Sequence, residues 1–271
     1  MMGGHHATTG AALGIAVAGT SALTLGLVDG VRTTEVLAVT LMTAGAALLP
    51  DVDHHNGSIA NSLPGFGPLP SVTEVLCRIV ANLSGGHRRG THSLLGLAVF
   101  VLLTALLGRF VVDIRGVPVS IGAGLLGIVL AAFALDALRI SRAGRVWPWL
   151  LALAAGVYLA LEFPTAGWVL PLSVGLGCAV HVLGDMLTTG GVPLLWPVVV
   201  KPPRALSRIP GLNAIWKRSG LFAVPVLGNA GSAREWALCS LVSIYVVAAL
   251  AAEIGILAPT LSALGALTGK G

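Results

Sequence analysis

Long apolar runs, separated by polar segments, dominate the hydrophobic pattern of this 271-residue chain. A helix that crosses a bilayer needs about 20 mostly apolar residues. Some of the runs fall short of that length, 35–50 and 147–163 most clearly. The pattern predicts an all-α fold, a polytopic bundle of about seven transmembrane helices over residues 8–28, 35–50, 92–112, 117–138, 147–163, 166–187 and 235–257.

Two long polar segments interrupt this series of apolar runs. The first, 51–91, begins with a loop rich in Gly, Pro and Ser over 56–70. Apolar residues then recur at helical spacing over 71–83, which predicts an amphipathic helix lying on the membrane surface. The second segment, 188–234, mixes Trp196 and Trp216 with Lys and Arg, so we expect it to lie against the membrane as well.

The composition supports a membrane protein of one integral domain, 1–271. Hydrophobic residues make up 55% of the chain and charged residues 10%, whereas charged residues in a soluble domain reach about 25%. The net charge of +5 then indicates basic loops facing anionic lipid, and we expect membrane lipids as partners and no nucleic acid. Cys77, Cys178 and Cys239 form no CxxC pair and are expected to be free buried thiols.

The distribution of Lys and Arg predicts the orientation. Twelve lie at the amino end and in the alternate loops that share its side of the membrane, and four lie on the other side. The positive-inside rule makes the first side cytoplasmic, in a multi-pass protein of the inner or plasma membrane. Residues 1–9 contain no Lys or Arg, so no cleaved signal peptide is expected. All seven histidines fall on the predicted cytoplasmic side, which favours a single site.

Metal-binding residue types are concentrated just after the second apolar run, from Pro50 to His55. Carboxylates and imidazoles are the ligands of Zn²⁺, Mn²⁺ and Fe²⁺. We expect Asp51 and Asp53 to bind a metal, and His54 to bind it or to support a ligand, with His55 exposed. The alternative is that these carboxylates are solvated in a loop.

Three other segments carry similar residues. His181 and Asp185 are four residues apart, so they share one face of a helix, either as ligands or as a pair that locks two helices. His92 opens the third apolar run, where Thr91 or Ser93 could cap the helix. We expect His87 to be a loop residue. Before the first run, His6 is preferred over His5 because it lies nearer the helix, although a solvated tail is the alternative.

Arg88 and Arg89 lie between His87 and His92. A guanidinium group matches the geometry of a phosphate, so both are candidate substrate-binding residues. The alternative is that they only anchor the loop on the cytoplasmic side. Motifs for serine or cysteine nucleophiles, zincin helices, P-loops and dinucleotide binding are absent from the sequence. Water activated by a metal is therefore the remaining enzymatic option.

Together these motifs resemble the YdjM-like, LexA-regulated inner-membrane metal-dependent hydrolase family. The resemblance covers residues 5–197 and includes an early His before a Gly-rich run. Its other motifs are Leu48-Leu-Pro-Asp-Val-Asp-His54, Arg89-Gly-Thr-His-Ser93, His181-Val-Leu-Gly-Asp185 and Thr188-Thr-Gly-Gly-Val-Pro-Leu-Leu-Trp-Pro197. It implies a membrane-bound metal hydrolase and suggests Asp51, Asp53, His54 and His92 as site residues. His5, His55 and His87 depart from the family pattern.

The resulting hypothesis is a hydrolase that uses one or two divalent metals, Zn first and Mn or Fe as alternatives, to activate water against a lipid phosphoester. Asp53 would take the proton from the water, and Arg88 and Arg89 would bind the phosphate. The expected metal ligands are His6, Asp51, Asp53, His54, His92, His181 and Asp185. A metal or ion transporter and a non-catalytic membrane protein with a structural metal are the alternatives. The oligomeric state does not follow from the sequence.

Overall fold

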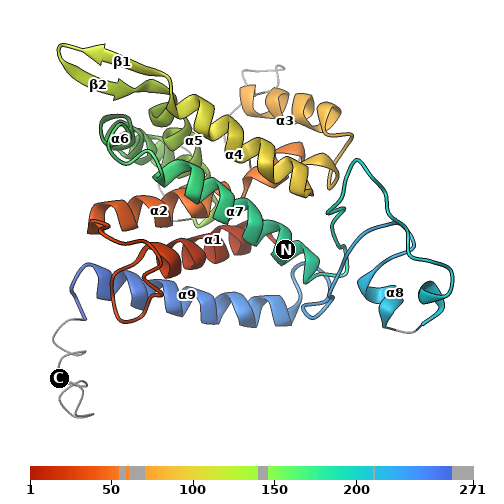
Figure 1. The fold of residues 1–271 in the computed structure, drawn as a ribbon. Coiled ribbons are helices and arrows are strands. Elements are labelled where there is room, and N and C mark those ends of the chain that lie inside the picture. Colours follow the sequence, from red (N-terminus) through yellow and green to blue (C-terminus); the bar gives the residue numbers. More distant parts are fainter. Residues whose placement is uncertain (55–58, 61–70, 140–145, 210, 258–271) are drawn as a thin grey trace, which may run out of the picture.

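The structure is a computed structural model that describes residues 1–54, 59–60, 71–139, 146–209 and 211–257. Most of the predicted 56–70 loop and His55 therefore lie outside the described residues. Each predicted apolar run overlaps a helix, and these helices pack side by side (Figure 1). They are α1 (Gly3–Ala18), α2 (Thr33–Ala46), α4 (Leu94–Gly108), α5 (Ile121–Ala137), α6 (Val146–Glu162), α7 (Val169–Met186) and α9 (Ala233–Glu253).

By length and composition, three described helical stretches can cross a membrane. They are Thr33–Asp53, which combines α2 with the 3₁₀ turn η1 (Leu49–Asp53), Val169–Met186 and Ala233–Glu253. The helices α4, α5 and α6 are apolar but shorter. The chain is therefore a mostly helical membrane protein, and the prediction of seven spans stays a prediction.

Helix α2 lies at the centre of the bundle, where it packs against α1, α5 and α7. Small residues permit the close approach. A Cβ atom at Gly10 or Gly14 of α1 would collide with α2 near Thr43 and Thr40, and one at Gly45 would overlap the Leu130 carbonyl of α5. The small residues of the first apolar run therefore bring α1 close to α2, as helix packing in lipid requires.

The first predicted helix, 8–28, is wrong at both ends. Helix α1 begins at Gly3, which places His5 and His6 within it, and it ends at Ala18. The chain then leaves the helix because Glu253 of α9 binds the next backbone groups. Its carboxylate accepts hydrogen bonds from the Thr20 and Ser21 amides at 2.9 and 3.2 Å. A carboxylate distant in sequence thus replaces the helical partners.

The all-α prediction missed one hairpin, β1 (Val111–Ile114) and β2 (Val117–Ser120), which pair antiparallel. It occupies the ends of two predicted helices, 92–112 and 117–138. Arg115 and Gly116 form the turn with φ angles of 56° and 82°, a two-residue connection that suits the twist of paired strands. The β-branched residues around it favour strand over helix. Figure 1 shows the hairpin projecting from the end of the bundle opposite the α8 segment.

The two long polar segments carry short elements. Helix α3 (Val72–Leu83) matches the predicted amphipathic helix. It exposes an apolar face formed by Val72, Val75, Leu76, Ile79 and Leu83. Its other face buries Thr73 and Cys77, and burial raises the pKa of the Cys77 thiol to about 11. The second segment contains η3 (Leu206–Arg208) and α8 (Leu212–Ile215), which lie beyond the ends of α7 and α9 (Figure 1).

Candidate metal centre

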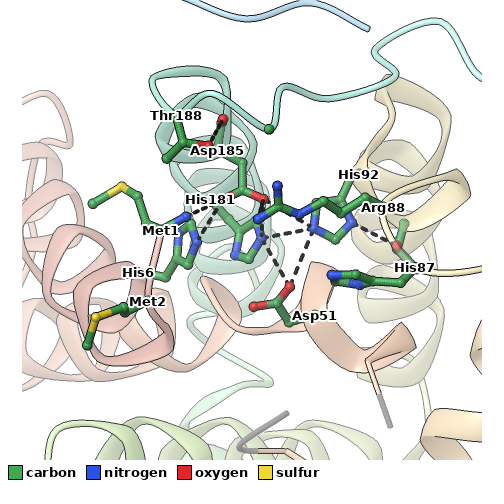
Figure 2. A network of polar contacts seen from close by, with 12 residues as sticks. Met1, Met2, His6, Asp51, His87, Arg88, His92, His181, Asp185 and Thr188 are labelled. Atoms are coloured by element: carbon green, nitrogen blue, oxygen red, sulfur yellow. Dashed lines mark hydrogen bonds and ion pairs between the residues drawn. The ribbon is translucent and has the colours of Figure 1, made fainter. Parts of the chain in front are cut away.

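Four chain segments bring histidine and aspartate side chains together at one end of the bundle (Figure 2). Helix α1 supplies His6, the turn η1 supplies Asp51, and η2 (Gly90–His92) supplies His92. Helix α7 supplies His181 and Asp185. In the described chain, three overlapping groups could each hold a metal ion: His6, His181 and Asp185; Asp51, His92 and His181; and Asp51, Asp53 and His87.

Helix α7 presents two of the donors on one face, because residues four apart in a helix lie one above the other. His181 is 0% exposed and Asp185 is 1% exposed. The Nε2 atom of His181 lies 3.9 Å from Oδ2 of Asp185. Between them in sequence, Gly184 leaves room for the start of the chain, since a Cβ atom there would lie 2.6 Å from the sulfur of Met1.

The hydrogen bonds of His181 fix which of its ring nitrogens faces the cluster. Its Nδ1 lies 2.6 Å from the Ala47 carbonyl oxygen, which can only accept a hydrogen bond. The proton of a neutral ring is therefore on Nδ1, and Nε2 carries a bare lone pair. Metal-binding histidines are commonly held in this way by a carbonyl or carboxylate partner.

His92 is held in the same tautomer through a hydroxyl group. The Thr91 hydroxyl donates its one proton to Oδ2 of Asp53, at 2.6 Å. It can then only accept from Nδ1 of His92, at 3.0 Å. Nδ1 of a neutral His92 ring therefore carries the proton, and Nε2 again carries a bare lone pair directed at the cluster.

These two bare lone pairs face each other inside the protein. The Nε2 atoms of His92 and His181 are 3.2 Å apart, and both residues are 0% exposed. Oδ1 of Asp51 lies 3.5 Å from the first and 3.7 Å from the second. Ligand bonds of about 2.0–2.1 Å at a tetrahedral metal place ligand atoms about 3.3 Å apart. The spacing and the donor types therefore fit a divalent cation.

His6 adds a further donor from α1. Its ring stacks on His181 with centroids 3.7 Å apart, and its Nε2 lies 3.3 Å from Oδ1 of Asp185. Neither ring nitrogen of this fully buried residue has a hydrogen-bond partner. Buried polar atoms without partners are costly, so a cation at this position would satisfy them.

Asp53 belongs to one of the three groups that could hold a metal, but hydrogen bonds from three residues already occupy its carboxylate. Its buried carboxylate binds Nδ1 of His87 at 2.7 Å, the Arg88 amide at 3.0 Å and the Thr91 hydroxyl at 2.6 Å. These bonds fix the loop that leads to His92. They also occupy the carboxylate, which argues against the predicted role of Asp53 as the base. In return, its hydrogen bond holds the pKa of the His87 imidazole above the usual value.

The other histidines of the four motifs lie around the cluster. The His54 ring contacts the His87 ring at 4.5 Å, outside the three groups that could hold a metal. His5 points to the other side of α1, where its Nδ1 binds Glu235 of α9 at 2.5 Å. The structure thus places His6 in the cluster and His5 in a contact between helices.

Cationic groups border the donors. The Arg88 guanidinium lies 3.1 Å from Oδ2 of Asp185, and the amino group of Met1 contacts Oδ1 of the same carboxylate. Figure 2 shows the Arg88 guanidinium beside the Asp185 carboxylate. Arg88 and Arg89 also line a pocket of about 500 Å³ with His87 and Trp196. This pocket opens beside the metal centre.

Sequence reasoning missed three contributors. It treated His87 as a plain loop residue, whereas His87 binds Asp53 and belongs to one group that could hold a metal. It offered Thr91 or Ser93 as the helix cap; Ser93 caps α4 by accepting from the Gly96 amide at 3.0 Å, and the role of Thr91 beside His92 was not foreseen. The Ala47 carbonyl has no signal in a sequence. The position of Thr91 directly before His92 was the only available hint of its role.

Fold and site together define a class of protein: a mostly helical membrane protein with a buried His/Asp centre that could hold a metal. Residues 1–255 match the YdjM inner membrane protein family, and the chain belongs to this family. The resemblance inferred from the motifs is thereby confirmed. Comparisons with curated proteins and with solved structures gave no match.

Proposed function

We propose that the chain is one integral membrane domain that acts as a metal-dependent hydrolase on a phosphoester of a lipid or membrane-associated substrate. The observation that carries the metal is the pair of bare Nε2 lone pairs, on His92 and His181, that face each other at 3.2 Å. Two such lone pairs repel unless a cation lies between them. Imidazole and carboxylate donors suit Zn²⁺ best, and Mn²⁺ or Fe²⁺ are the alternatives.

His6, Asp51, His92, His181 and Asp185 would hold one or two ions. A divalent ion held there would lower the pKa of a water molecule and polarise the bond to be cleaved. Among the carboxylates of the cluster, Asp51 is the most open, with its side chain 25% exposed. Since Oδ1 of Asp51 faces His92 and His181, we assign to its other oxygen the removal of the proton from water, in place of Asp53.

The pocket beside the centre supports a phosphate-bearing substrate. Arg88 and Arg89 line it, and a guanidinium group binds phosphate through two parallel hydrogen bonds. Arg88 lies against Asp185, so it would hold a phosphate next to the donors, while the exposed Arg89 would bind its outer oxygens. Trp196 and Val198 give the same pocket an apolar wall that suits a lipid.

The arrangement of the helices supports a multi-pass protein of the inner membrane. We propose that all seven long helices lie in the bilayer, with the metal centre facing the cytoplasm, where most Lys and Arg side chains lie. The exposed apolar face of α3 would then rest on the lipid surface. Membrane lipids are the expected partners.

One observation favours a second function, a metal that only ties the helices together. His6, His92 and His181 are all 0% exposed, and structural metal sites are closed in this way. A catalytic site needs an open position for water. The exposed part of Asp51 and the adjoining pocket favour the hydrolase.

Elemental analysis combined with an activity screen tests the proposal. Purified protein should contain about one or two equivalents of metal, and His181→Ala should lose it, whereas Asp136→Ala on α5 should keep it. Metal-loaded wild type should release product from phospholipids in mixed micelles, and Arg89→Gln should raise KM. Bound metal without turnover would favour the structural role, and equal metal content in all variants would exclude the site.

A further inference from the structure

A second pocket, outside the metal centre, is lined almost entirely by basic side chains. It has a volume of about 330 Å³ and lies in the segment that follows α7. We call it the basic hollow; its lining residues are Lys201, Pro202, Arg204, Arg208 and Arg218. None of them belongs to the groups that could hold a metal.

The charge of the basic hollow is not balanced within its own segment. From Met186 to Arg234 the sequence contains six Lys and Arg residues and no Asp or Glu. Like charges gathered around one hollow repel each other and create a strong positive potential. An anion in the hollow would relieve this repulsion, and Arg side chains are suited to the oxygens of a phosphate.

Contacts between backbones and side chains hold this segment in place. Lys217 donates hydrogen bonds to the carbonyl oxygens of Thr189 and Gly190, the latter at 3.1 Å. Val192 and Phe222 exchange backbone hydrogen bonds of 2.9 Å in both directions. The basic residues are thus presented by a segment that is anchored next to the end of α7.

Exposed apolar residues accompany the basic ones in this segment. Val199, Leu206, Ile209 and Ile215 are all more than a third exposed in the same segment. Basic residues interleaved with exposed apolar residues are typical of segments that lie on anionic membranes. We propose that the basic hollow binds a phosphate group, on the head group of an anionic lipid or as free phosphate.

The test uses full-length protein in detergent after treatment with EDTA, so that a metal cannot contribute to binding. Calorimetry with inorganic phosphate and native mass spectrometry with phosphatidylglycerol, against phosphatidylcholine, separate the two sources. The double variant R204Q/R208Q removes two charge-assisted contacts and should weaken binding at least about 10-fold. R109Q/R115Q removes the same charge at the distant end of α4 and in the turn of the hairpin, and it should bind like the wild type.

The outcomes decide both the site and the source. Binding of inorganic phosphate supports a site for free phosphate, and binding of phosphatidylglycerol alone supports a lipid head group. R204K/R208K keeps the charges and should retain binding; its loss would count against the charge as the cause. Equal losses in R204Q/R208Q and R109Q/R115Q, or no binding of either probe to the wild type, would overturn the proposal. Because the metal is absent, these results do not depend on the proposed hydrolase.

Discussion

At the scale of single residues, hydrogen bonds to one ring nitrogen decide what the other can do. The Ala47 carbonyl fixes His181, and the hydroxyl of Thr91, itself bound to Asp53, fixes His92. Each arrangement leaves Nε2 without a proton in the neutral ring. The donors are therefore ready to bind a cation without a change of tautomer.

Replacing Thr91 by Val tests this arrangement, because it removes the hydroxyl and keeps the shape. The His92 ring would lose the partner that fixes its proton on Nδ1. We expect metal affinity to fall by about 10–100-fold, as for other supporting groups around metal ligands. Metal titration by competition with a chelator measures the change.

Thr104→Val is the matched control for this substitution. Thr104 is also buried, and its hydroxyl binds only the Phe100 carbonyl of its own helix. Its metal affinity should match the wild type. If the two variants behaved alike, the hydroxyl of Thr91 would have no part in holding the donor.

The adjacent residues His5 and His6 give a second prediction at this scale. His6→Ala removes a buried nitrogen donor next to Asp185, so metal affinity should fall at least about 10-fold. His5→Ala breaks the contact with Glu235 and should lower thermal stability while the metal stays bound. Elemental analysis beside thermal unfolding separates the two effects. Retention of metal by His6→Ala would remove α1 from the site.

At the scale of elements, the site depends on how closely the helices approach one another. Helix α1 carries His6, α2 leads into η1 with Asp51, and α7 carries His181 and Asp185. Small residues such as Gly10 and Gly177 lie where α1 and α7 meet α2. A wider spacing would separate the donors beyond the reach of one cation.

Gly45→Ala should destabilise the bundle, since its new Cβ atom would overlap the Leu130 carbonyl of α5. Overpacking of this kind costs about 1–3 kcal/mol. We expect a lower Tm, measured by thermal unfolding of the protein in detergent.

Gly175→Ala in α7 is the control, because its Cβ atom would make an ordinary contact 3.5 Å from Val101. It should leave the Tm unchanged or raise it slightly, since Ala favours a helix over Gly. A Tm for Gly45→Ala equal to that of the control would contradict the close contact.

At the scale of the whole molecule, α3 and the hairpin β1–β2 lie on opposite sides of the membrane in the proposed topology. Their exposed residues offer positions for labelling. Leu83 of α3 is 79% exposed and Val112 of β1 is 39% exposed. The native cysteines are buried and should contribute little background.

A membrane-impermeant maleimide should therefore label Leu83→Cys only in inside-out vesicles and Val112→Cys only in spheroplasts. The physical reason is the excess of Lys and Arg on the side of α3, which the positive-inside rule retains in the cytoplasm. Labelling of both positions from the same side would show that the chain does not cross the membrane between them. The reverse pattern would place the metal centre outside.

The sequence by itself determined the membrane class, the approximate positions of the long helices and the family. Apolar runs of this length have few other stable forms, because a bilayer requires every backbone group to be paired within the segment. The sequence also placed His181 and Asp185 on one face of a helix, because they are four residues apart and an α-helix has about 3.6 residues per turn. The predicted segregation of the histidines to one side of the membrane favoured a single site.

Two pairs of residues, His5 with His6 and Asp51 with Asp53, are close neighbours in the sequence. Only the tertiary structure decided how each member of these pairs is used. It placed His6 in the metal centre and His5 against Glu235. It also showed that the Asp53 carboxylate is hydrogen-bonded to Thr91 and His87. The hairpin and the early end of α1, where Glu253 binds the chain, also emerged only there. The physical reason is common to all of them: each depends on a partner distant in sequence, and no local pattern of residues specifies that partner.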